Sequence, residues 1–444
     1  MLTVLANRTY RHLFFAQVIA LIGTGLATVA LGLLAFDIAG ADSGAVLGTA
    51  MAIKMVAYIG VAPVVGAFAS RLPRRGFLVT MDVVRALVAL CLPFVDQVWQ
   101  IYVLIFVLQS ASAGFTPTFQ ATIPDILPDE KDYTRALSLS RMAYDLESLL
   151  SPVLAAVLLT VMNFHWLFGG TSIGFAISAL LVLSVALPRS TASQPSGDIY
   201  AKTTRGTRIY LKTPRLRGLL AITLAAAAAS AMVIVNTPVL VQAGMGLGQR
   251  EVALTLAAFG GGSMVCALIL PRLLDRISDR RVMLAGAAVL VGVLAVLAAS
   301  WGAHGSPAFW GFVLLAWFLL GLGYSATVTP GGRLLRRSSN SEDRPTLFAA
   351  QFALSHVCWL IAYPLAGQIG ALSGFGVAFA VCAALAAAGA GIALLIWPAA
   401  DPDAVTHSHD DLPLDHPHVL AEHSGGAQAH AFVIDDLHPQ WPRN

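Results

Sequence analysis

The sequence predicts an all-α integral membrane protein with twelve transmembrane helices arranged as two six-helix bundles. Apolar residues make up 57% of the 444 residues and charged residues only 11%, whereas a soluble domain carries about 25% charged residues. The apolar residues form runs of roughly 20, the length that crosses a bilayer core about 30 Å thick. Lysine and arginine gather in alternate connections between these runs. Together these observations exclude a cytosolic enzyme, a nucleic-acid-binding protein and a disordered scaffold.

Charged or Gly/Pro-rich breaks divide the apolar part of the chain into twelve segments. The first begins near Leu13 and reaches Phe36. It is too long for the apolar core of a signal peptide, and no small-residue cleavage site follows it, so we expect it to be the first membrane helix. The expected helices cover residues 12–36, 45–69, 77–95, 99–121, 136–161, 165–187, 217–241, 251–274, 282–301, 308–328, 346–369 and 374–397.

The distribution of lysine and arginine predicts the orientation of the chain. The odd-numbered connections carry only Arg250, and the even-numbered ones carry the other basic residues between the segments. The positive-inside rule therefore predicts that the even connections and both termini are cytoplasmic, in a multi-pass protein of the plasma (bacterial inner) membrane. The basic residues of the even connections are Arg71, Arg74 and Arg75, then Lys131, seven residues from Arg189 to Arg217, Arg272, Arg276, Arg280 and Arg281, and Arg333, Arg336, Arg337 and Arg344.

The longest internal break divides the chain into two halves. We expect an N-terminal bundle at 1–187, a cytoplasmic central loop at 188–215, a C-terminal bundle at 216–398 and a disordered His/Asp-rich tail at 399–444. The halves are weakly similar, because a related basic loop follows the second segment of each half. The loop reads GAFASRLPRR in the first half and PRLLDRISDR in the second half. Internal repeats with a binding site near the bilayer midplane are typical of secondary transporters.

These two loops resemble the cytoplasmic loop motif of the major facilitator superfamily, roughly G-x-L-x-D-R-x-G-R-R. In the first loop Ser70 replaces the usual Asp and Pro73 the second Gly. The resemblance covers about residues 5–400 and implies charge contacts that latch one conformation, which Asp82 and Arg85 could supply in place of the missing Asp. The alternative is that the loop arginines only determine topology. The residues that match the motif are Gly66, Arg71, Arg74 and Arg75 in the first copy and Asp275 and Arg276 in the second.

Within this superfamily two features resemble the nickel-resistance exporters. One is the region of the fourth and fifth segments, which includes FQAT at 119–122, RALSLSR at 135–141 and YDLE at 144–147; the other is a His-rich tail after the membrane part. The resemblance implies export of nickel or cobalt from the cytoplasm in exchange for protons. Two alternatives remain open, namely a proton-coupled multidrug exporter of lipophilic compounds and a non-transporting membrane metal sensor.

Ionisable residues inside membrane segments are costly and mark candidate functional sites. The fifth segment holds Arg141, Asp145 and Glu147, and a rise of about 1.5 Å per residue places the two acids about 15–18 Å from its start, near the bilayer midplane. Lys54 lies about half way along the second segment and His356 along the eleventh. We expect Asp145, Glu147 and His356 to couple protons or ions, with Lys54 and Arg141 as charge partners. The alternatives are a structural salt bridge for the acids and an interhelical hydrogen bond for the histidine.

The tail carries seven of the eleven histidines, interspersed with aspartates. Short His-rich tracts are typical of metal binding, and imidazole with carboxylate suits borderline divalent metals. We expect a flexible chelator, whereas the alternative is a solvating tail whose histidines have no role. The expected metal ligands are His407, His409, His416, His418, His423, His430 and His438.

The energy source is expected to be an ion gradient or the gradient of the substrate. The sequence contains no G-x-x-x-x-G-K-[ST] run, the phosphate-binding loop of many ATPases. We therefore expect neither a cofactor nor an enzymatic activity. The expected partners are a divalent metal ion or another small-molecule substrate, protons and the lipid bilayer, and no nucleic acid.

Overall fold

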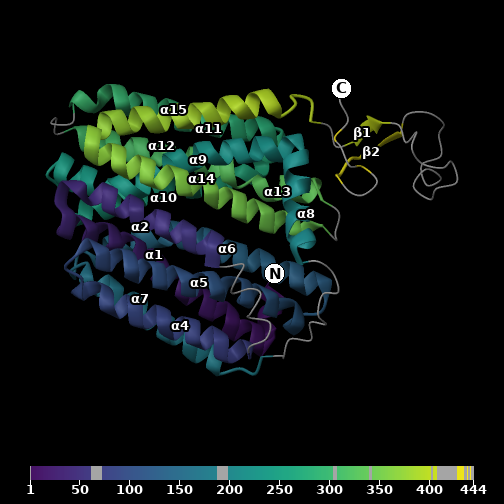
Figure 1. Cartoon of the computed structure of the whole chain (residues 1–444), viewed down its shortest axis with the longest axis horizontal. Helices are drawn as coiled ribbons and strands as arrows, with labels where there is room; N and C mark the ends of the chain where they lie inside the picture. The colour runs from purple at the N-terminus through teal and green to yellow at the C-terminus, as the bar shows by residue number, and fades with distance from the viewer. Residues whose placement is uncertain are drawn as a thin grey trace.

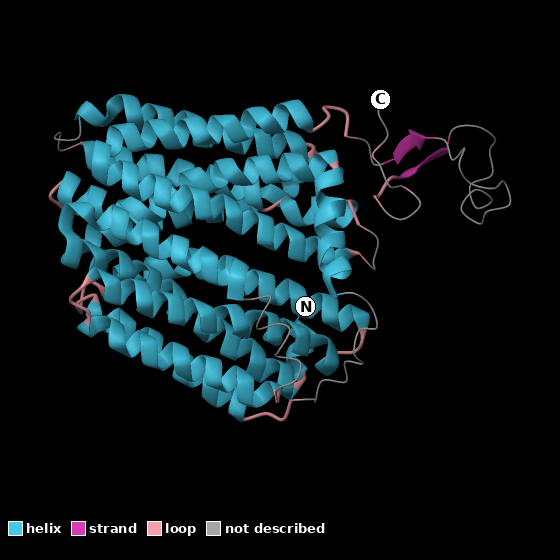
Figure 2. Ribbon diagram, in the orientation of Figure 1, coloured by secondary structure: helices cyan, strands magenta, loops and turns pink. Residues whose placement is uncertain are grey.

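The computed structural model describes residues 2–61, 73–187, 199–303, 308–339, 343–401, 404–407, 428–434, 438 and 441. Helices make up nearly all of the described chain, and two short strands lie beside the helical body (Figure 2). The first half contains α1 (Arg8–Ala39), α2 (Ser43–Val56), α4 (Arg74–Cys91), α5 (Val98–Ile126), α6 (Glu130–Leu158) and α7 (His165–Leu183). The second half contains α9 (Pro214–Val239), α10 (Gln249–Leu274), α11 (Asp279–Ser300), α12 (Phe309–Val328), α14 (Arg344–Ser373) and α15 (Phe375–Ile396).

Each of the twelve expected segments corresponds to one of these helices, which confirms the predicted fold class. Among the described residues, ten helical stretches are long and apolar enough to cross a membrane, and the first of them, Arg8–Val61, contains both α1 and α2. The remaining helix is α6, which is more polar because it carries Glu130, Lys131, Asp132 and Arg135 in its first turns as well as the charged residues further along. The pattern of apolar runs therefore located all twelve helices, and the charges of α6 distinguish it from the others.

The two halves pack their helices in the same way (Figure 1). In the first half α1 and α4 pack on α7, α5 packs on α4, and α6 packs on α1. In the second half α9 and α11 pack on α15, α12 packs on α11, and α14 packs on α9. Each contact of the first half thus has its counterpart six membrane helices later, as a structural repeat requires.

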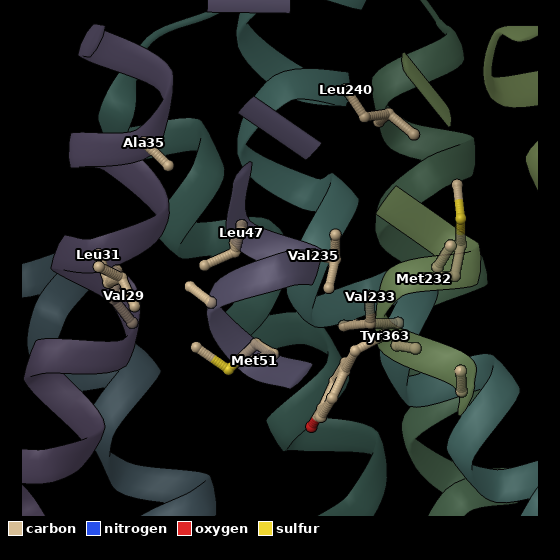
Figure 3. Packing of buried hydrophobic residues seen from close by; sticks show 14 of the residues in the cluster. Val29, Leu31, Ala35, Leu47, Met51, Met232, Val233, Val235, Leu240 and Tyr363 are labelled. Atoms are coloured by element: carbon tan, nitrogen blue, oxygen red, sulfur yellow. The ribbon is translucent and has the colours of Figure 1, made fainter. Parts of the chain in front are cut away.

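The halves meet along two equivalent pairs, α2 with α14 and α6 with α10. Leu47 and Met51 of α2 lie between α1 and the second half, where Val233 and Val235 of α9 and Tyr363 of α14 approach them (Figure 3). These side chains belong to one buried apolar cluster that runs through both halves. Close packing of this kind between halves leaves room for only a few discrete arrangements, because well-packed interiors do not deform continuously.

Glycines allow the backbones of α2 and α14 to touch. A Cβ atom at Gly48 would lie 2.6 Å from the carbonyl oxygen of Tyr363, and one at Gly367 would lie 2.2 Å from the carbonyl oxygen of Gly44. This contact lies at the end of the body that we call the arginine-poor end, where the short connections Gly40–Asp42 and residue 374 lie. The opposite, arginine-rich end carries the connections from α10 to α11 and from α12 to α14.

Shorter elements complete the chain. Helix α8 (Ile199–Lys212) lies within the expected central loop, and α13 (Gly331–Arg337) precedes α14. Two short π-helical segments, Ala57–Val61 and Leu240–Gly244, continue α2 and α9. Four 3-10 segments are Leu2–Ala6, Gly40–Asp42, Leu92–Phe94 and Trp301–Ala303.

The described part of the tail, for which disorder is expected over 399–444, contains two short strands. Strand β1 (Ala404–His407) pairs antiparallel with β2 (Gln428–Ala431). Phe432 and Ile434 follow β2 and are buried in an apolar cluster with Tyr210 of α8 and Trp397 at the end of α15. The reason is compositional, because the run from 431 to 434 is apolar and removes its side chains from water at the arginine-rich end.

Candidate functional site

Glu147 on α6 and Lys54 on α2 are described charged residues within the membrane segments of the first half. The Lys54 ammonium and the Glu147 carboxylate interact electrostatically. Both side chains are surrounded by protein, yet each keeps a partly accessible surface. This combination is expected of residues that line an internal passage, whereas a structural ion pair would be packed on all sides.

The two charges do not form a direct salt bridge. Among the described side chains, the ion pairs with nitrogen and oxygen within 4.0 Å do not include Lys54 with Glu147. The Lys54 Nζ atom instead lies 6.0 Å from the centroid of the Tyr58 ring, one helical turn further along. An ammonium over an aromatic face at this distance is weakly attracted by the ring quadrupole. The Glu147 carboxylate is therefore neutralised only through space.

A glycine and a serine complete the surroundings of Glu147. A Cβ atom at Gly25 of α1 would lie 2.6 Å from Glu147 Oε1 and 2.1 Å from Ser151 Oγ. Ser151 lies one turn after Glu147 on α6, so both side chains leave the same face of the helix toward α1. The absence of a side chain at Gly25 is what makes room for the two polar groups.

His356 lies on α14, on the other side of the boundary between the halves. Its Nδ1 atom is 2.6 Å from the carbonyl oxygen of Phe352, and because a carbonyl only accepts, Nδ1 carries the hydrogen of this bond. The ring centroids of His356 and Tyr58 are 5.3 Å apart, and His356 also interacts electrostatically with Lys54. The structure thus brings Glu147, Lys54 and His356 into one neighbourhood through Tyr58, a residue that the sequence analysis missed.

Two of the expected site residues have side chains outside the described part of the chain. Arg141 and Asp145 both lie within helix α6, one on each side of Tyr144. The Tyr144 side chain lies beside Gln17 of α1 and Thr116 of α5. Gln17 in turn accepts a hydrogen bond from Ser140 Oγ at 3.0 Å, so this stretch of α6 faces the interior of the first half.

A buried ion pair lies elsewhere in the first half, on α4. Asp82 is 0% exposed and pairs with Arg85, which is 5% exposed. The Arg85 guanidinium carbon lies 4.2 Å from the centroid of the Phe115 ring and 4.5 Å from that of Phe175. Ser178 Oγ donates a hydrogen bond of 2.7 Å to Asp82. Arg85 and Ser178 thus both contact the Asp82 carboxylate within the bundle, so the pair stabilises the first half, and among the described residues it makes no ion pair with a loop arginine.

The loop motif is partly visible at the arginine-rich end. Arg74 forms an ion pair with Asp125 at the end of α5, and Arg75 donates a hydrogen bond to the carbonyl oxygen of Leu183 on α7. Gly66 and Arg71 lie outside the described residues. The described part of the motif therefore links α4 to its neighbours within the first half.

Near the second copy, an acid outside the expected motif forms the described ion pairs. Asp275 and Arg276 are exposed between α10 and α11. Asp279, at the start of α11, instead lies 3.2 Å from Arg333 Nε and 3.5 Å from Arg337 Nη1. The two arginines are spaced by four residues on α13, so they point to the same side and reach one carboxylate. This spacing was a signal in the sequence that could have identified the contact.

Two described helices of the second half are uncharged, and aromatic side chains make several of its internal contacts. Helices α12 and α15 contain no charged residue. Trp359 donates a hydrogen bond of 2.9 Å to Ser230 Oγ, and the ring centroids of Phe259 and Tyr324 are 5.6 Å apart. These two helices therefore contribute only uncharged side chains to the second half.

The tail histidines occupy different environments. The strand register places His407 opposite Gln428 and His430 opposite Val405, in neighbouring positions of the ribbon. His438 is buried, with its ring centroid 4.8 Å from that of Phe432. His409, His416, His418 and His423 lie outside the described residues. Among the residues that the structure describes, no three His, Cys, Asp or Glu side chains form a group that could hold a metal ion.

The end of the chain is anchored on the second half. Arg215 of α9 forms an ion pair of 3.2 Å with Asp401, and its guanidinium lies 5.1 Å from the Trp441 ring centroid. The Tyr210 hydroxyl donates a hydrogen bond to Gln351. Burial, followed by the nearby Cys358 thiol, raises the pKa of Tyr210, so it stays a neutral donor. The tail thus begins and ends on one surface at the arginine-rich end.

Bacterial transporters resemble this chain in sequence. The uncharacterized MFS-type transporter YfiS of Bacillus subtilis is 23% identical over 334 residues, which cover 73% of this chain and 78% of YfiS. Macrolide efflux protein A of Enterococcus faecalis is 24% identical over 153 residues, which cover 32% of this chain and 47% of that protein. Macrolide efflux protein A of Streptococcus pyogenes is matched over 38% of its length. These matches to macrolide efflux proteins therefore span less than half of each relative.

Solved transporter structures share the fold at low sequence identity. The nucleoside transporter NupG superposes with a TM-score of 0.64 at 12% identity, over 88% of this chain and 99% of NupG. A bacterial homologue of the human lysosomal transporter Spinster, inward-facing and unoccupied, gives 0.69 at 10% identity over 87% and 96%. The D-xylose–proton symporter gives 0.62 at 13% identity over 88% and 96%.

The family follows from the sequence match and the fold together. The profile of the Major Facilitator Superfamily matches residues 13–277 and 219–422, which is most of the chain. The twelve helices with repeated packing agree with this match. The protein is a multi-pass membrane transporter and not an enzyme, and it belongs to the major facilitator superfamily.

Proposed function

We propose that this protein exports a cation in exchange for protons and that Glu147 is the group for which the two compete. The observation that carries the proposal is the incomplete pairing of Glu147, which is deep, partly accessible and without a direct ion-pair partner among the described side chains. A carboxylate holds either a proton or a cation, and this exclusion is what couples two opposite fluxes. Export as the direction is supported by the macrolide efflux relatives.

The proposed cargo is divalent nickel, with cobalt as the related ion. Seven histidines in the tail support it, because imidazole and carboxylate groups suit these metals. Inside the membrane part, Glu147 and His356 lie on opposite halves and are connected through Lys54 and Tyr58. A site whose ligands lie on both halves would be assembled in one arrangement of the halves and taken apart in the other. Such a site would bind the metal transiently and release it.

The tail would collect metal at the mouth of the transporter. Its anchor on Arg215 and Trp397 keeps the tail next to the second half, and such tethering raises the effective concentration of whatever the tail binds. This role requires the arginine-rich end to be cytoplasmic, with both termini on that side of the plasma membrane. The concentration of basic residues at that end supports this orientation.

A lipophilic drug is the second candidate cargo. The uncharged helices α12 and α15 and the aromatic contacts of the second half favour it, since sites for drug-sized ligands are lined mainly by hydrophobic and aromatic side chains. The relatives that carry the name macrolide efflux protein A support the same reading. In this case Glu147 would still exchange protons for the cation, and the histidines of the tail would have another role.

Flux into reconstituted vesicles tests the proposal. With an imposed pH gradient, vesicles that contain the protein should accumulate Ni²⁺ or Co²⁺, and accumulation should stop when the gradient is collapsed. Glu147→Gln should abolish the flux, whereas the control Glu251→Gln, at the first turn of α10, should retain it. Uptake of tetraphenylphosphonium without metal flux would favour the drug exporter.

Cells provide the second arm of the experiment. Accumulation of a panel of metals, with and without the protein, should show lower nickel content when the protein is present. Metal-dependent signalling without flux in vesicles would favour a sensor, and full nickel tolerance in cells that carry Glu147→Gln would contradict the role of this carboxylate.

A further inference from the structure

We infer that Lys54 is a tethered competitor of the cargo, whose ammonium lies beside Tyr58, interacts with Glu147 through space and has to move away when a cargo cation binds this carboxylate. The inference rests on the proposed function and assigns the determinant of affinity within that site. It makes Lys54 a competitor of the substrate and not only a partner of the acid.

The first argument is the convergence of polar groups on one small space. Glu147 Oε1 and Ser151 Oγ both lie within 2.6 Å of the position that a Cβ atom of Gly25 would take. Ser151 is 1% exposed, and its Oγ atom has no hydrogen-bond partner among the described residues. A buried hydroxyl without a partner is costly, and here its oxygen lies beside a carboxylate, where a cation could be bound by both.

The second argument is the aromatic wall. Lys54 Nζ lies 6.0 Å from the Tyr58 ring centroid, within the range at which a ring face attracts a cation. The same ring contacts the second half, with centroid distances of 5.3 Å to His356 and 6.0 Å to Phe352. A cation beside Tyr58 is therefore next to the boundary that has to rearrange during transport.

The third argument is the looseness of the pairing between Lys54 and Glu147. The two interact electrostatically, but they are not among the direct ion pairs of the described residues. By contrast, the Asp82–Arg85 pair of the same half is locked by Ser178 and two aromatic rings. A lysine is a point charge on a flexible four-carbon stem, so Lys54 can leave the carboxylate without any movement of the helices.

Displacement of Lys54 has a functional consequence. Two cations beside one carboxylate repel each other, so the cargo binds only by moving Lys54 away, and the tethered ammonium returns as soon as the cargo leaves. Lys54 thereby lowers the affinity for cargo and promotes its release. A mobile lysine of this kind would reject neutral compounds, since they do not compete for the carboxylate.

Equilibrium binding to the full-length protein in lipid nanodiscs tests this inference. The probes are Ni²⁺ and, separately, tetraphenylphosphonium, and the variants are Lys54→Gln, Lys54→Arg, Glu147→Gln and the control Lys212→Gln on α8. Removal of the competing charge should make Lys54→Gln bind the active probe at least about tenfold more tightly. Lys54→Arg and Lys212→Gln should stay within about threefold of the natural protein, and Glu147→Gln should lose binding.

A measurement on the natural protein does not depend on whether the variants fold. Labelling of Lys54 by an amine-reactive reagent, quantified by mass spectrometry against Lys212, should rise when the active probe is added, because the displaced amine is no longer held at the carboxylate. Unchanged or reduced labelling, or a Lys54→Gln variant that binds no more tightly than the natural protein, overturns the inference. If the proposed function itself is wrong, the result differs from the one that overturns the role of Lys54. In that case neither the natural protein nor Lys54→Gln binds Ni²⁺ or tetraphenylphosphonium.

Discussion

Replacing Gly48 with alanine should open the contact between α2 and α14 at the arginine-poor end. The new Cβ atom would lie 2.6 Å from the carbonyl oxygen of Tyr363 and 3.2 Å from the Cα atom of Gly367. Both of these atoms belong to the backbone, so no side-chain rotation relieves the overlap. Ordinary contact begins at 3.4 Å, and the helices therefore have to separate by about 0.8 Å at this point.

The expected magnitude follows from the cost of overpacking. Forcing an extra methyl group into a close-packed interior costs about 1–3 kcal/mol. Only the arrangement in which the two helices touch bears this cost, so the equilibrium should shift toward the arrangement that is open at the arginine-poor end by about 5- to 150-fold. The magnitude assumes that the open arrangement separates these backbones.

Distance measurements between paired spin labels provide the assay. Labels at Asp42 and Leu372, both exposed at the arginine-poor end, should show a larger population of long distances in Gly48→Ala than in the parent, with the exposed Cys91 replaced in both. Gly60→Ala is the matched control, because a Cβ atom at Gly60, also in the second membrane segment, meets nothing within 4 Å. Unchanged distances in a Gly48→Ala protein of normal thermal stability would refute the reasoning.

Three further predictions concern the site, the first half and the tail. Gly25→Ala should abolish transport while the protein stays folded, because its Cβ atom would lie 2.1 Å from Ser151 Oγ at the proposed cation site. Vesicle flux measures transport and size-exclusion chromatography measures folding, and normal flux would count against that site. Arg85→Met should lower the free energy of unfolding by about 3–5 kcal/mol, because it leaves the buried Asp82 charge unpaired. Arg135→Met, which removes an exposed ion pair, should lower it by at most about 1 kcal/mol. Thermal unfolding in detergent compares the two variants, and equal losses of stability would contradict the structural role of the Asp82–Arg85 pair. Deletion of residues 405–444 should weaken nickel tolerance while flux in vesicles continues, and an unaffected tolerance would remove the tail from the proposal.

The pattern of apolar runs was sufficient to predict the helices because each membrane-spanning helix has to satisfy its own backbone hydrogen bonds over the full bilayer thickness. The end of α10 at Leu274, for example, agrees with the apolar segment 251–274, whereas α7 ends at Leu183, four residues before the predicted end at 187. The positions of Lys54 and Glu147 along their helices were predictable for the same reason, because each residue advances an α-helix by about 1.5 Å. Whether the two form a tight salt bridge was not predictable, because that depends on the distance between two different helices.

Other contacts depend on residues that are far apart in the sequence and give no local signal. Tyr58 joins Lys54 to His356 only because α2 packs against α14. Asp279, an acid outside the expected motif, forms its ion pairs because α13 presents Arg333 and Arg337 to it. Each of these contacts joins elements whose relative rotation is set by packing and not by periodicity.

By itself, then, the sequence determined that this protein crosses the membrane twelve times in two related halves, and that its deep acids lie in the first half and its histidines in the tail. These properties are local or additive, since they depend on composition, periodicity and position along a helix. The tertiary structure decided which of these groups meet. It left Glu147 loosely paired, locked Asp82 to Arg85, buried His438 beside Phe432 and brought the glycines of α2 and α14 into contact, because such distances between elements are set by the packing of the whole body.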